Sequence, residues 1–294
     1  MLAMILQEMH RHCDGQEEVF MKIGFVDYYL DEWHANNYPQ WIRETSGGEM
    51  EVSLAFGLID SLIGGRTSAQ WCADMGIPQA KSIEEVVETC DAIVVLSPDN
   101  CEMHEQLCQL PLRSGKPVYV DKTFAPDGET ARRIFAIAGE SHTPCYSTSA
   151  LRYAEEYQGL KGIRAISTWG PNEFETYSIH QLEPVMMLMG VDAARVMYLP
   201  GEGWYTLAIE FADGRKATIT GFAHGSPFLA NVEMEAGAKL IEVKSDYFHR
   251  FIEHMVAFFR NPQLAVPHAE TLRIMDVRGA GLKAIAAPGT WVRV

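Results

Sequence analysis

The sequence predicts a two-domain α/β protein: an N-terminal Rossmann-type parallel sheet, followed by a C-terminal α+β domain with an open, mostly antiparallel sheet. Before about residue 148, short apolar runs alternate with helical patterns, which is typical of a parallel sheet covered on both faces. After that point, strand-like segments follow one another with few helices between them, as in an antiparallel sheet. The length of 294 residues is also appropriate for about two domains.

The first domain is expected to span residues 21–148, after an N-terminal extension of residues 1–20 with a weak helical pattern. Its expected strands are 22–26, 52–56, 92–96 and 117–120. Its expected helices are 33–43, 67–75, 83–90, 101–114 and 127–141. Glycine and proline residues, such as Gly76, Gly115 and Pro117, mark the ends of several of these elements.

The second domain is expected to span residues 149–294. Its expected strands are 163–169, 194–199, 204–211, 216–222, 231–236 and 239–243, with helices at 178–189 and 247–260. The Asp213-Gly214 dipeptide between two of these strands is typical of a tight hairpin turn. Because an open sheet leaves a face that needs covering, we expect a homodimer or homotetramer.

Composition excludes several classes of partner. The formal net charge of −15 argues against nucleic acid, whose phosphates need clustered lysine and arginine. No apolar run approaches the roughly 18 residues of a membrane span, and the N-terminus lacks the basic leader of a signal peptide, so a cytoplasmic protein is expected. The six cysteines have no zinc-site spacing, so no metal site is expected.

The loop after the first strand lacks the glycines of a dinucleotide site. In a Rossmann unit, GxGxxG lets the backbone turn tightly and lets a helix N-terminus approach the pyrophosphate. Here the strand runs into Asp27-Tyr28-Tyr29-Leu30-Asp31-Glu32, whose acids favour the following helix but repel a pyrophosphate. The acid that would bind the ribose at the end of the second strand is also missing, since that position is Gly57. Because two determinants are absent, ordinary NAD binding cannot be assumed from this sequence.

Two polar segments follow predicted strands at the edge where open α/β sheets bind ligands. Ser97-Pro98-Asp99-Asn100 follows the third strand and leads to His104; the alternative is a simple helix start with Ser and Asp caps. Lys122 follows the fourth strand, where an ammonium can polarise a hydroxyl or carbonyl group. A lysine at the end of a strand is otherwise an ordinary solvated residue.

A third segment, Tyr177-Ser-Ile-His180-Gln-Leu-Glu183, opens a helix of the second domain. His180 and Glu183 lie one turn apart, so they are expected to share a face. A carboxylate can hold an imidazole in one tautomer and make it a general acid or base. The alternative is a capped helix start with an incidental histidine. Arg152 and Tyr153, just after the domain crossover, are candidates to bind an anionic or polyhydroxylated ligand.

Taken in order from Lys22 to the C-terminus, these segments resemble the glucose–fructose oxidoreductase/inositol dehydrogenase (Gfo/Idh/MocA) family. The 97–104 segment is similar to the family's TPN…H motif, and Asp121-Lys122-Thr123 is similar to its EKP motif. Ser149–Tyr153 resembles its domain-crossing arginine segment, and the segment around His180 resembles its DxGxHxxD helix motif. The closing Ala286–Val292 segment looks like its C-terminal strand.

The resemblance implies hydride transfer between NAD or NADP and a sugar, cyclitol or related hydroxyl compound. It implies that Lys122 binds substrate and cofactor, that His180 moves the proton with Glu183 beside it, and that the second domain mediates oligomerisation. Arg152, Tyr153 and Tyr177 are the candidate substrate ligands. The candidate cofactor contacts are Asp27, Tyr28, Tyr29, Ser97, Pro98, Asp99 and His104. Because the departures from the family's motifs concentrate on the dinucleotide side, we expect a weakened or unusual NAD(P) site.

Three hypotheses follow from this pattern. The first is an oxidoreductase acting on a small polyhydroxylated molecule with an unorthodox cofactor loop. The second is a non-redox lyase, epimerase or isomerase on the same scaffold that uses Lys122 and His180 for proton transfer. The third is a non-catalytic binding or regulatory subunit, in which the loop 27–34 is a packed surface.

Overall fold

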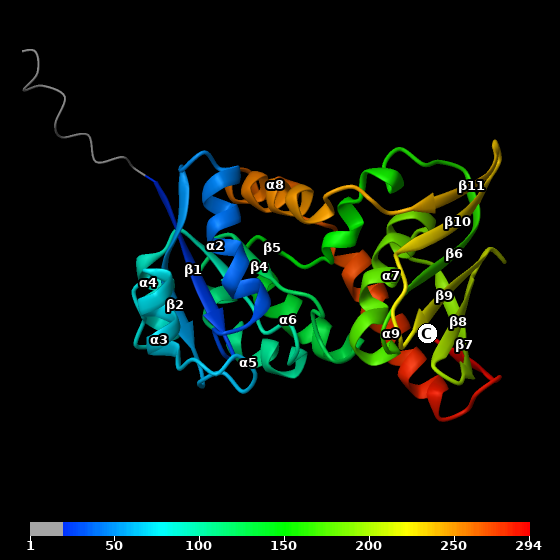
Figure 1. The fold of residues 1–294 in the computed structure, drawn as a ribbon, viewed down its shortest axis with the longest axis horizontal. Helices are drawn as coiled ribbons and strands as arrows, with labels where there is room; N and C mark the ends of the chain where they lie inside the picture. Colours follow the sequence, from blue (N-terminus) through cyan, green and yellow to red (C-terminus); the bar gives the residue numbers. More distant parts are fainter. Residues whose placement is uncertain (1–19) are drawn as a thin grey trace, which may run out of the picture.

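The structure, a computed structural model, describes residues 20–294 (Figure 1). The predicted extension therefore lies outside the described residues, except for its last residue, Phe20. Two sheets organise the chain, one of five strands and one of seven, and helices pack on both. This confirms the predicted fold class. None of the helices within residues 20–294 is long and apolar enough to cross a membrane.

The first sheet is parallel, with strand order β2-β1-β3-β4-β5. Its strands are β1 (Met21–Asp27), β2 (Met50–Gly57), β3 (Ala92–Val95), β4 (Val118–Val120) and β5 (Cys145–Tyr146). The helices of this part are α2 (Trp33–Thr45), α3 (Ser68–Met75), α4 (Ile83–Thr89), α5 (His104–Leu107) and α6 (Gly128–Glu140). The strand order reverses between β1 and β3, so ligands are expected beyond the carboxyl ends of these strands.

The helix expected at 101–114 is instead broken into short pieces. A 3₁₀ turn (Cys101–Met103) leads into α5, and a second 3₁₀ turn (Pro111–Arg113) follows it. Pro111 lacks the N–H group that a continuing helix requires, so the α-helical pattern cannot pass through it. The two-residue strand β5 was not predicted either, because a segment this short has no detectable periodicity.

The second sheet has the order β11-β10-β6-β9-β8-β7-β12, and its neighbours are antiparallel except for the parallel pair β6 and β9. Its strands are β6 (Ile163–Pro171), β7 (Ala193–Gly201), β8 (Trp204–Phe211), β9 (Lys216–Phe222), β10 (Leu229–Met234), β11 (Gly237–Glu242) and β12 (Trp291–Arg293). Two helices, α7 (Phe174–Met189) and α9 (His268–Ile285), pack against this sheet and against each other.

Helix α9 was missed in the sequence, although its buried side includes Ile274, Met275 and Val277. Glycines 279 and 281 lie in its interior, where glycine weakens a helical signal. The structure explains the second of them, since any side chain at Gly281 would collide with the ring of Phe174 on α7. Close packing of two helices therefore outweighs the low helix propensity of glycine here.

Helix α8 (Tyr247–Arg260), which the sequence places with the second domain, covers the first sheet (Figure 1). Its buried residues Phe251, Ile252 and Met255 belong to the same apolar cluster as Ile23 and Phe25 of β1. The helix also packs beside α2. The chain thus returns to its N-terminal sheet after building most of the second one.

Gly24 in β1 provides a test of how closely α4 packs against the first sheet. A Cβ atom at this position would collide with Val86 of α4 and lie 3.0 Å from the Cys90 sulfur. We expect Gly24→Ala to lower the free energy of unfolding by about 1–3 kcal/mol, because both neighbours are fully buried and cannot move away. Urea denaturation measures this change.

Gly139→Ala in α6 is the matched control. A Cβ atom there meets nothing within 4 Å, so stability should stay unchanged or rise by up to about 1 kcal/mol. Equal effects of the two substitutions would contradict the close approach of α4 to β1.

Candidate functional site

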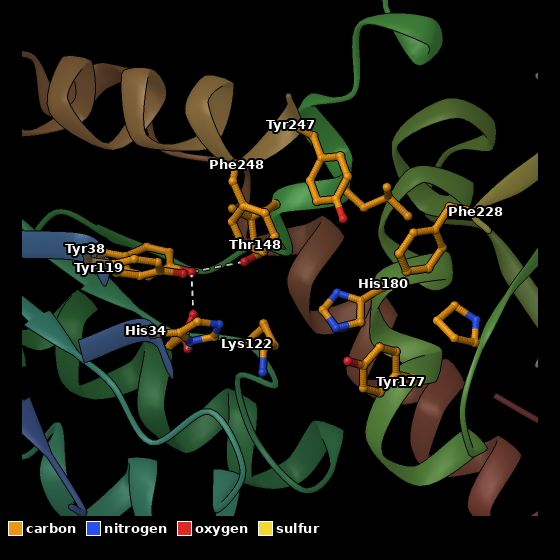
Figure 2. Close-up of a pocket in the computed structure, with 14 residues that line it drawn as sticks. His34, Tyr38, Tyr119, Lys122, Thr148, Tyr177, His180, Phe228, Tyr247 and Phe248 are labelled. Atoms are coloured by element: carbon orange, nitrogen blue, oxygen red, sulfur yellow. Dashed lines mark hydrogen bonds and ion pairs between the residues drawn. The ribbon is translucent and has the colours of Figure 1, made fainter. Parts of the chain in front are cut away.

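A cavity of about 200 Å³ lies between the two sheets, and most of the sequence-predicted chemistry borders it (Figure 2). This volume is below that of pockets for drug-sized ligands and is appropriate for a small molecule. Residues from both parts of the chain line it, among them His34, Tyr38, Asp121, Lys122, Tyr177, His180, Phe228 and Phe248. Its wall is thus largely aromatic, with a few polar groups that converge on one space.

Lys122 lies just after β4, as the sequence predicted, and its half-buried side chain reaches the cavity. Its Nζ atom lies 3.3 Å from the carbonyl oxygen of Pro98, so the segment after β3 and the segment after β4 meet at one edge. Ser97 in that segment has a φ of 93°, a backbone conformation that non-glycine residues rarely adopt. Pro98 therefore lies beside the lysine, but Ser97, Pro98 and Asp99 do not line the cavity itself.

His180 projects from α7 into the cavity opposite Lys122 (Figure 2). Its Nδ1 lies 2.7 Å from the hydroxyl of Ser149, which leaves Nε2 as the ring nitrogen available to a ligand. Burial, together with the positive charges of Lys122 and His34, lowers the pKa of His180 to about 3. The imidazole is therefore neutral near pH 7. Tyr177 packs against this ring at a centroid distance of 5.0 Å.

The expected pairing of His180 with Glu183 is wrong. Glu183 accepts hydrogen bonds from Thr148 at 2.7 Å and from Arg152 at 2.9 Å, and Arg152 also pairs with Glu270. A charged partner stabilises a buried carboxylate more than a neutral imidazole does, so Glu183 pairs with the Arg152 guanidinium. Burial raises the pKa of Glu183, and Arg152 opposes that effect.

Two of the three predicted substrate ligands lie outside the cavity. Arg152 ties α7 to α9 through its two carboxylate partners. Tyr153 borders a second, more open depression with Arg250 and His254. Tyr177 alone of the three lines the central cavity. Their roles as substrate ligands stay predictions.

The sequence analysis missed a His–carboxylate pair in the cavity wall, formed by His34 and Asp121. His34 Nδ1 lies 2.5 Å from Asp121 Oδ2, and the Tyr119 hydroxyl lies 2.8 Å from Asp121 Oδ1. Burial alone would raise the pKa of Asp121, but His34, Lys122 and Tyr119 lower it to about 2. The two residues follow β1 and β4 at the same sheet edge. The rule that ligand groups gather at that edge could therefore have identified them.

The glycine-free loop after β1 is closed by its own side chains. Glu32 caps α2 by accepting hydrogen bonds from the backbone N–H of His34, at 2.6 Å, and from that of Ala35. These N–H groups are the ones that a Rossmann fold offers to a pyrophosphate. Tyr29 and Leu30 are buried in the loop, and none of residues 27–33 lines the cavity. A carboxylate of the chain thus occupies the place of the ligand's anion.

Asp27 ends β1 and is 1% exposed, with no hydrogen-bond partner for either carboxyl oxygen among the described residues. Burial and the nearby Glu32 raise its pKa well above the usual range. Burial also raises the pKa of Glu32, to about 7. The charge of His34 and the hydrogen bonds from the backbone N–H groups of Ala35 and His34 act in the opposite direction. Neither acid is suited to receive a phosphate.

The end of β2, where a ribose would bind, is closed as well. Asp31 pairs with Arg66, which also donates to Asn36 Oδ1 at 2.7 Å. At Gly57 a Cβ atom would lie 2.7 Å from the Ser68 hydroxyl and 3.2 Å from Leu30. An acid therefore cannot replace Gly57 without displacing these neighbours. Side chains of the chain itself thus fill both the loop after β1 and the end of β2.

The hydrogen bonds of His104 indicate a structural role. It is fully buried in α5, with Nδ1 at 3.0 Å from the Phe124 carbonyl oxygen and Nε2 at 2.7 Å from that of Leu96. Burial lowers the pKa of this imidazole. It links the segments after β3 and β4, and it does not line the cavity. Within residues 20–294, no three His, Cys, Asp or Glu side chains gather in a group able to hold a metal ion.

Residues 56–148 match the profile of GFO_IDH_MocA, described as an oxidoreductase family with an NAD-binding Rossmann fold. The match begins at the end of β2 and omits β1 and the loop after it. No curated protein sequence matches the chain.

Solved structures share the whole fold at low sequence identity. A myo-inositol dehydrogenase from Corynebacterium glutamicum is 12% identical with a TM-score of 0.74, covering 94% of this chain and 99% of that one. A probable dehydrogenase from Thermotoga maritima is 12% identical with a TM-score of 0.75, covering 93% and 99%. An oxidoreductase from Agrobacterium radiobacter, in complex with NAD+, L-tartaric acid and magnesium, is 11% identical with a TM-score of 0.73, covering 93% and 98%.

Because Glu32, the N-cap residue of α2, is buried and has a raised pKa, we expect an unusual pH dependence of stability. Because its pKa is raised from 4.5 to about 7 in the fold, the folded state binds the proton more tightly than the unfolded state. Stability from this group is present below about pH 4.5 and is lost as the pH rises through about 7. We expect Glu32→Gln to stabilise the protein, relative to wild type, by up to about 3 kcal/mol more at pH 8 than at pH 5.

Chemical denaturation at the two pH values measures this difference. Asp127→Asn at the exposed N-cap of α6 is the matched control, because hydrogen bonds from Thr130 lower the pKa of Asp127. Loss of the Asp127 carboxylate should therefore lower the free energy of unfolding more at neutral than at acid pH, which is the opposite pH dependence. A Glu32→Gln effect that is independent of pH would contradict the raised pKa of this buried carboxyl group.

Proposed function

We propose that this chain, whose residues 56–148 match the model of the Gfo/Idh/MocA oxidoreductase family, is an enzyme acting on a small polyhydroxylated compound, a sugar or cyclitol, in the cavity between its sheets. Lys122 and His180 carry out proton transfer there, and the NAD(P) site is weakened. The observation that carries this proposal is the convergence of a lysine and a half-buried, neutral histidine on a cavity of small-molecule size.

The division of labour follows from the surroundings of each group. The Lys122 ammonium is a point charge able to polarise a hydroxyl or carbonyl oxygen of the substrate. His180, neutral and held at Nδ1 by Ser149, accepts the proton at Nε2. Aromatic neighbours such as Phe228 and Phe248 exclude water and cover the apolar C–H faces of a sugar or cyclitol ring. The named myo-inositol dehydrogenase of the same fold supports this substrate class.

Hydride transfer would require a dinucleotide, and the loop 27–34 does not fit one bound in the Rossmann manner. The cap Glu32, the unpartnered Asp27 and the crowded Gly57 all support a weakened NAD(P) site. They also favour the non-redox alternative, in which Lys122 and His180 act on a substrate that needs no hydride acceptor. A purely structural or regulatory role would not require these two side chains to converge.

The open face of the second sheet supports an assembly of identical chains. Its solvent side includes the half-buried Thr206, Ala208 and Thr218 beside the exposed Trp204. A second copy of the chain is the proposed occupant of this face.

The proposal predicts separate results for polyol and for cofactor. Saturation-transfer NMR should detect binding of myo-inositol or 2-keto-myo-inositol. Calorimetry should give an NAD+ dissociation constant weaker than about 1 mM. Glu32→Ser, which keeps a helix cap but removes the charge, should tighten NAD+ binding. Micromolar affinity of the wild type for NAD+ would contradict a weakened site.

Lys122→Ala and His180→Ala should each lower turnover of the bound compound by about 10²–10⁴-fold, measured by NMR with and without NAD+. Lys161→Ala, at an exposed position before β6, is the control and should leave turnover unchanged. If both site variants turn over the compound at the wild-type rate, the proposed roles are wrong.

A further inference from the structure

The cavity contains a second imidazole that the family's motifs do not account for. His34 comes from the first turn of α2, in the very loop that lacks the dinucleotide glycines. It lines the same cavity as Lys122 and His180, and Figure 2 shows the two histidines on opposite sides of the lysine. The residue is buried, so its ring has little contact with solvent other than through the cavity.

Three contacts fix the orientation of this ring. Nδ1 lies 2.5 Å from Asp121 Oδ2, and the ring stacks on Tyr38 at an angle of 14°. The backbone N–H of His34 donates to the Glu32 carboxylate at 2.6 Å. The Glu32 side chain that occupies the place of a pyrophosphate therefore also fixes the start of the helix that carries His34.

An imidazole with one nitrogen on a carboxylate has the arrangement of a general acid/base, because the carboxylate stabilises the protonated ring and fixes its tautomer. Asp121 is itself held, since the Tyr119 hydroxyl lies 2.8 Å from its other oxygen and 3.1 Å from the Thr148 carbonyl. With Nδ1 engaged, Nε2 of His34 is the nitrogen available to a ligand. His180 has the same arrangement, with a serine hydroxyl in place of the carboxylate.

We propose that His34 is a second catalytic residue, which transfers a proton on the side of the substrate opposite His180. The substrate class is then an α-hydroxy ketone, such as a ketocyclitol or keto sugar, and the reaction is epimerisation at the carbon next to the carbonyl. This inference rests on the proposed function, because it needs a polyhydroxylated compound between Lys122 and the two histidines.

The step balances without an oxidant. One imidazole takes the proton from the carbon beside the carbonyl, and the C–H electron pair forms the carbon–carbon double bond of an enediolate. The carbonyl π pair moves to oxygen, where the Lys122 ammonium stabilises the charge. The other ring, which enters the step as an imidazolium, gives the proton on its Nε2 to the opposite face, and the carbonyl forms again. Proton exchange with solvent then returns each ring to its starting charge. No hydride leaves the substrate, in agreement with a loop that does not fit a dinucleotide.

The test uses 2-keto-myo-inositol and its epimer in deuterium oxide, without added nucleotide, followed by ¹H NMR. The wild type should exchange the proton beside the carbonyl and interconvert the two epimers. His34→Asn keeps a donor near Asp121 but removes Nε2, so epimerisation should fall by at least about 100-fold. The variant should still exchange the proton of the one epimer that faces His180.

His180→Asn should show the mirror result, with exchange retained only in the other epimer. This crossed pattern distinguishes a proton-transfer role from a structural one, because loss of folding would abolish both exchanges together. His249→Gln on the exposed side of α8 is the matched control and should behave as wild type. Thermal unfolding checks each variant, and His34→Gln replaces His34→Asn if the latter does not fold.

The outcomes separate this inference from the proposed function. Failure of both ketones to bind, by saturation-transfer NMR, overturns the proposed function and the inference with it. Binding without proton exchange in the wild type overturns the inference alone. Equal exchange of both epimers by a folded His34→Asn or His34→Gln variant also overturns it, since His180 would then serve both faces.

Discussion

The hydrogen bonds between the Glu32 carboxylate and the first N–H groups of α2 are the interaction on which the site depends. The first N–H groups of a helix must be satisfied by a side chain, by water or by a ligand. In this chain the sequence supplies the acceptor itself, so the helix begins without an external anion. The same contact fixes the first turn of α2 and, with it, the position of His34 beside Asp121. The Glu32 carboxylate thus occupies the helix N-terminus where a pyrophosphate would bind, and it also positions a residue of the cavity wall.

Three acids, Asp27, Glu32 and Asp121, lie near one another in a buried region, yet they differ in the form they favour. Asp121 has His34 and Lys122 beside it, so its carboxylate is stable and its pKa is low. For Asp27 and Glu32 the effect of burial is larger than the opposing effects of their neighbours, so burial favours their neutral forms. The region therefore needs fewer positive charges than its composition suggests, because mutual repulsion is relieved by protonation. A protein with a formal net charge of −15 can concentrate acids here without a matching set of cations.

Much of the fold could be predicted because it is encoded locally. Apolar runs of strand length and the loss of glycine after β1 are visible in the sequence, and Lys122 and His180 follow from their places after a strand and on a helix. The partners of these residues could not be predicted, because they depend on packing. The sequence spacing pairs His180 with Glu183, but Arg152 lies close enough to take that carboxylate. The His34–Asp121 pair joins residues 87 positions apart; the sheet-edge rule places both residues at one edge, but no periodicity predicts that they are in contact.

The return of α8 to the first sheet also has a consequence for how the chain folds during synthesis. One apolar face of β1, including Ile23 and Phe25, is covered partly by Phe251 and Met255. While the ribosome makes the intervening two hundred or so residues, at about 5–20 residues per second, the part of that face that α8 covers lacks its native partner. For tens of seconds the nascent protein therefore exposes an apolar sheet surface, which makes it a natural client for chaperones. The packing around β1, the first strand to be made, is complete only after α8 has been made.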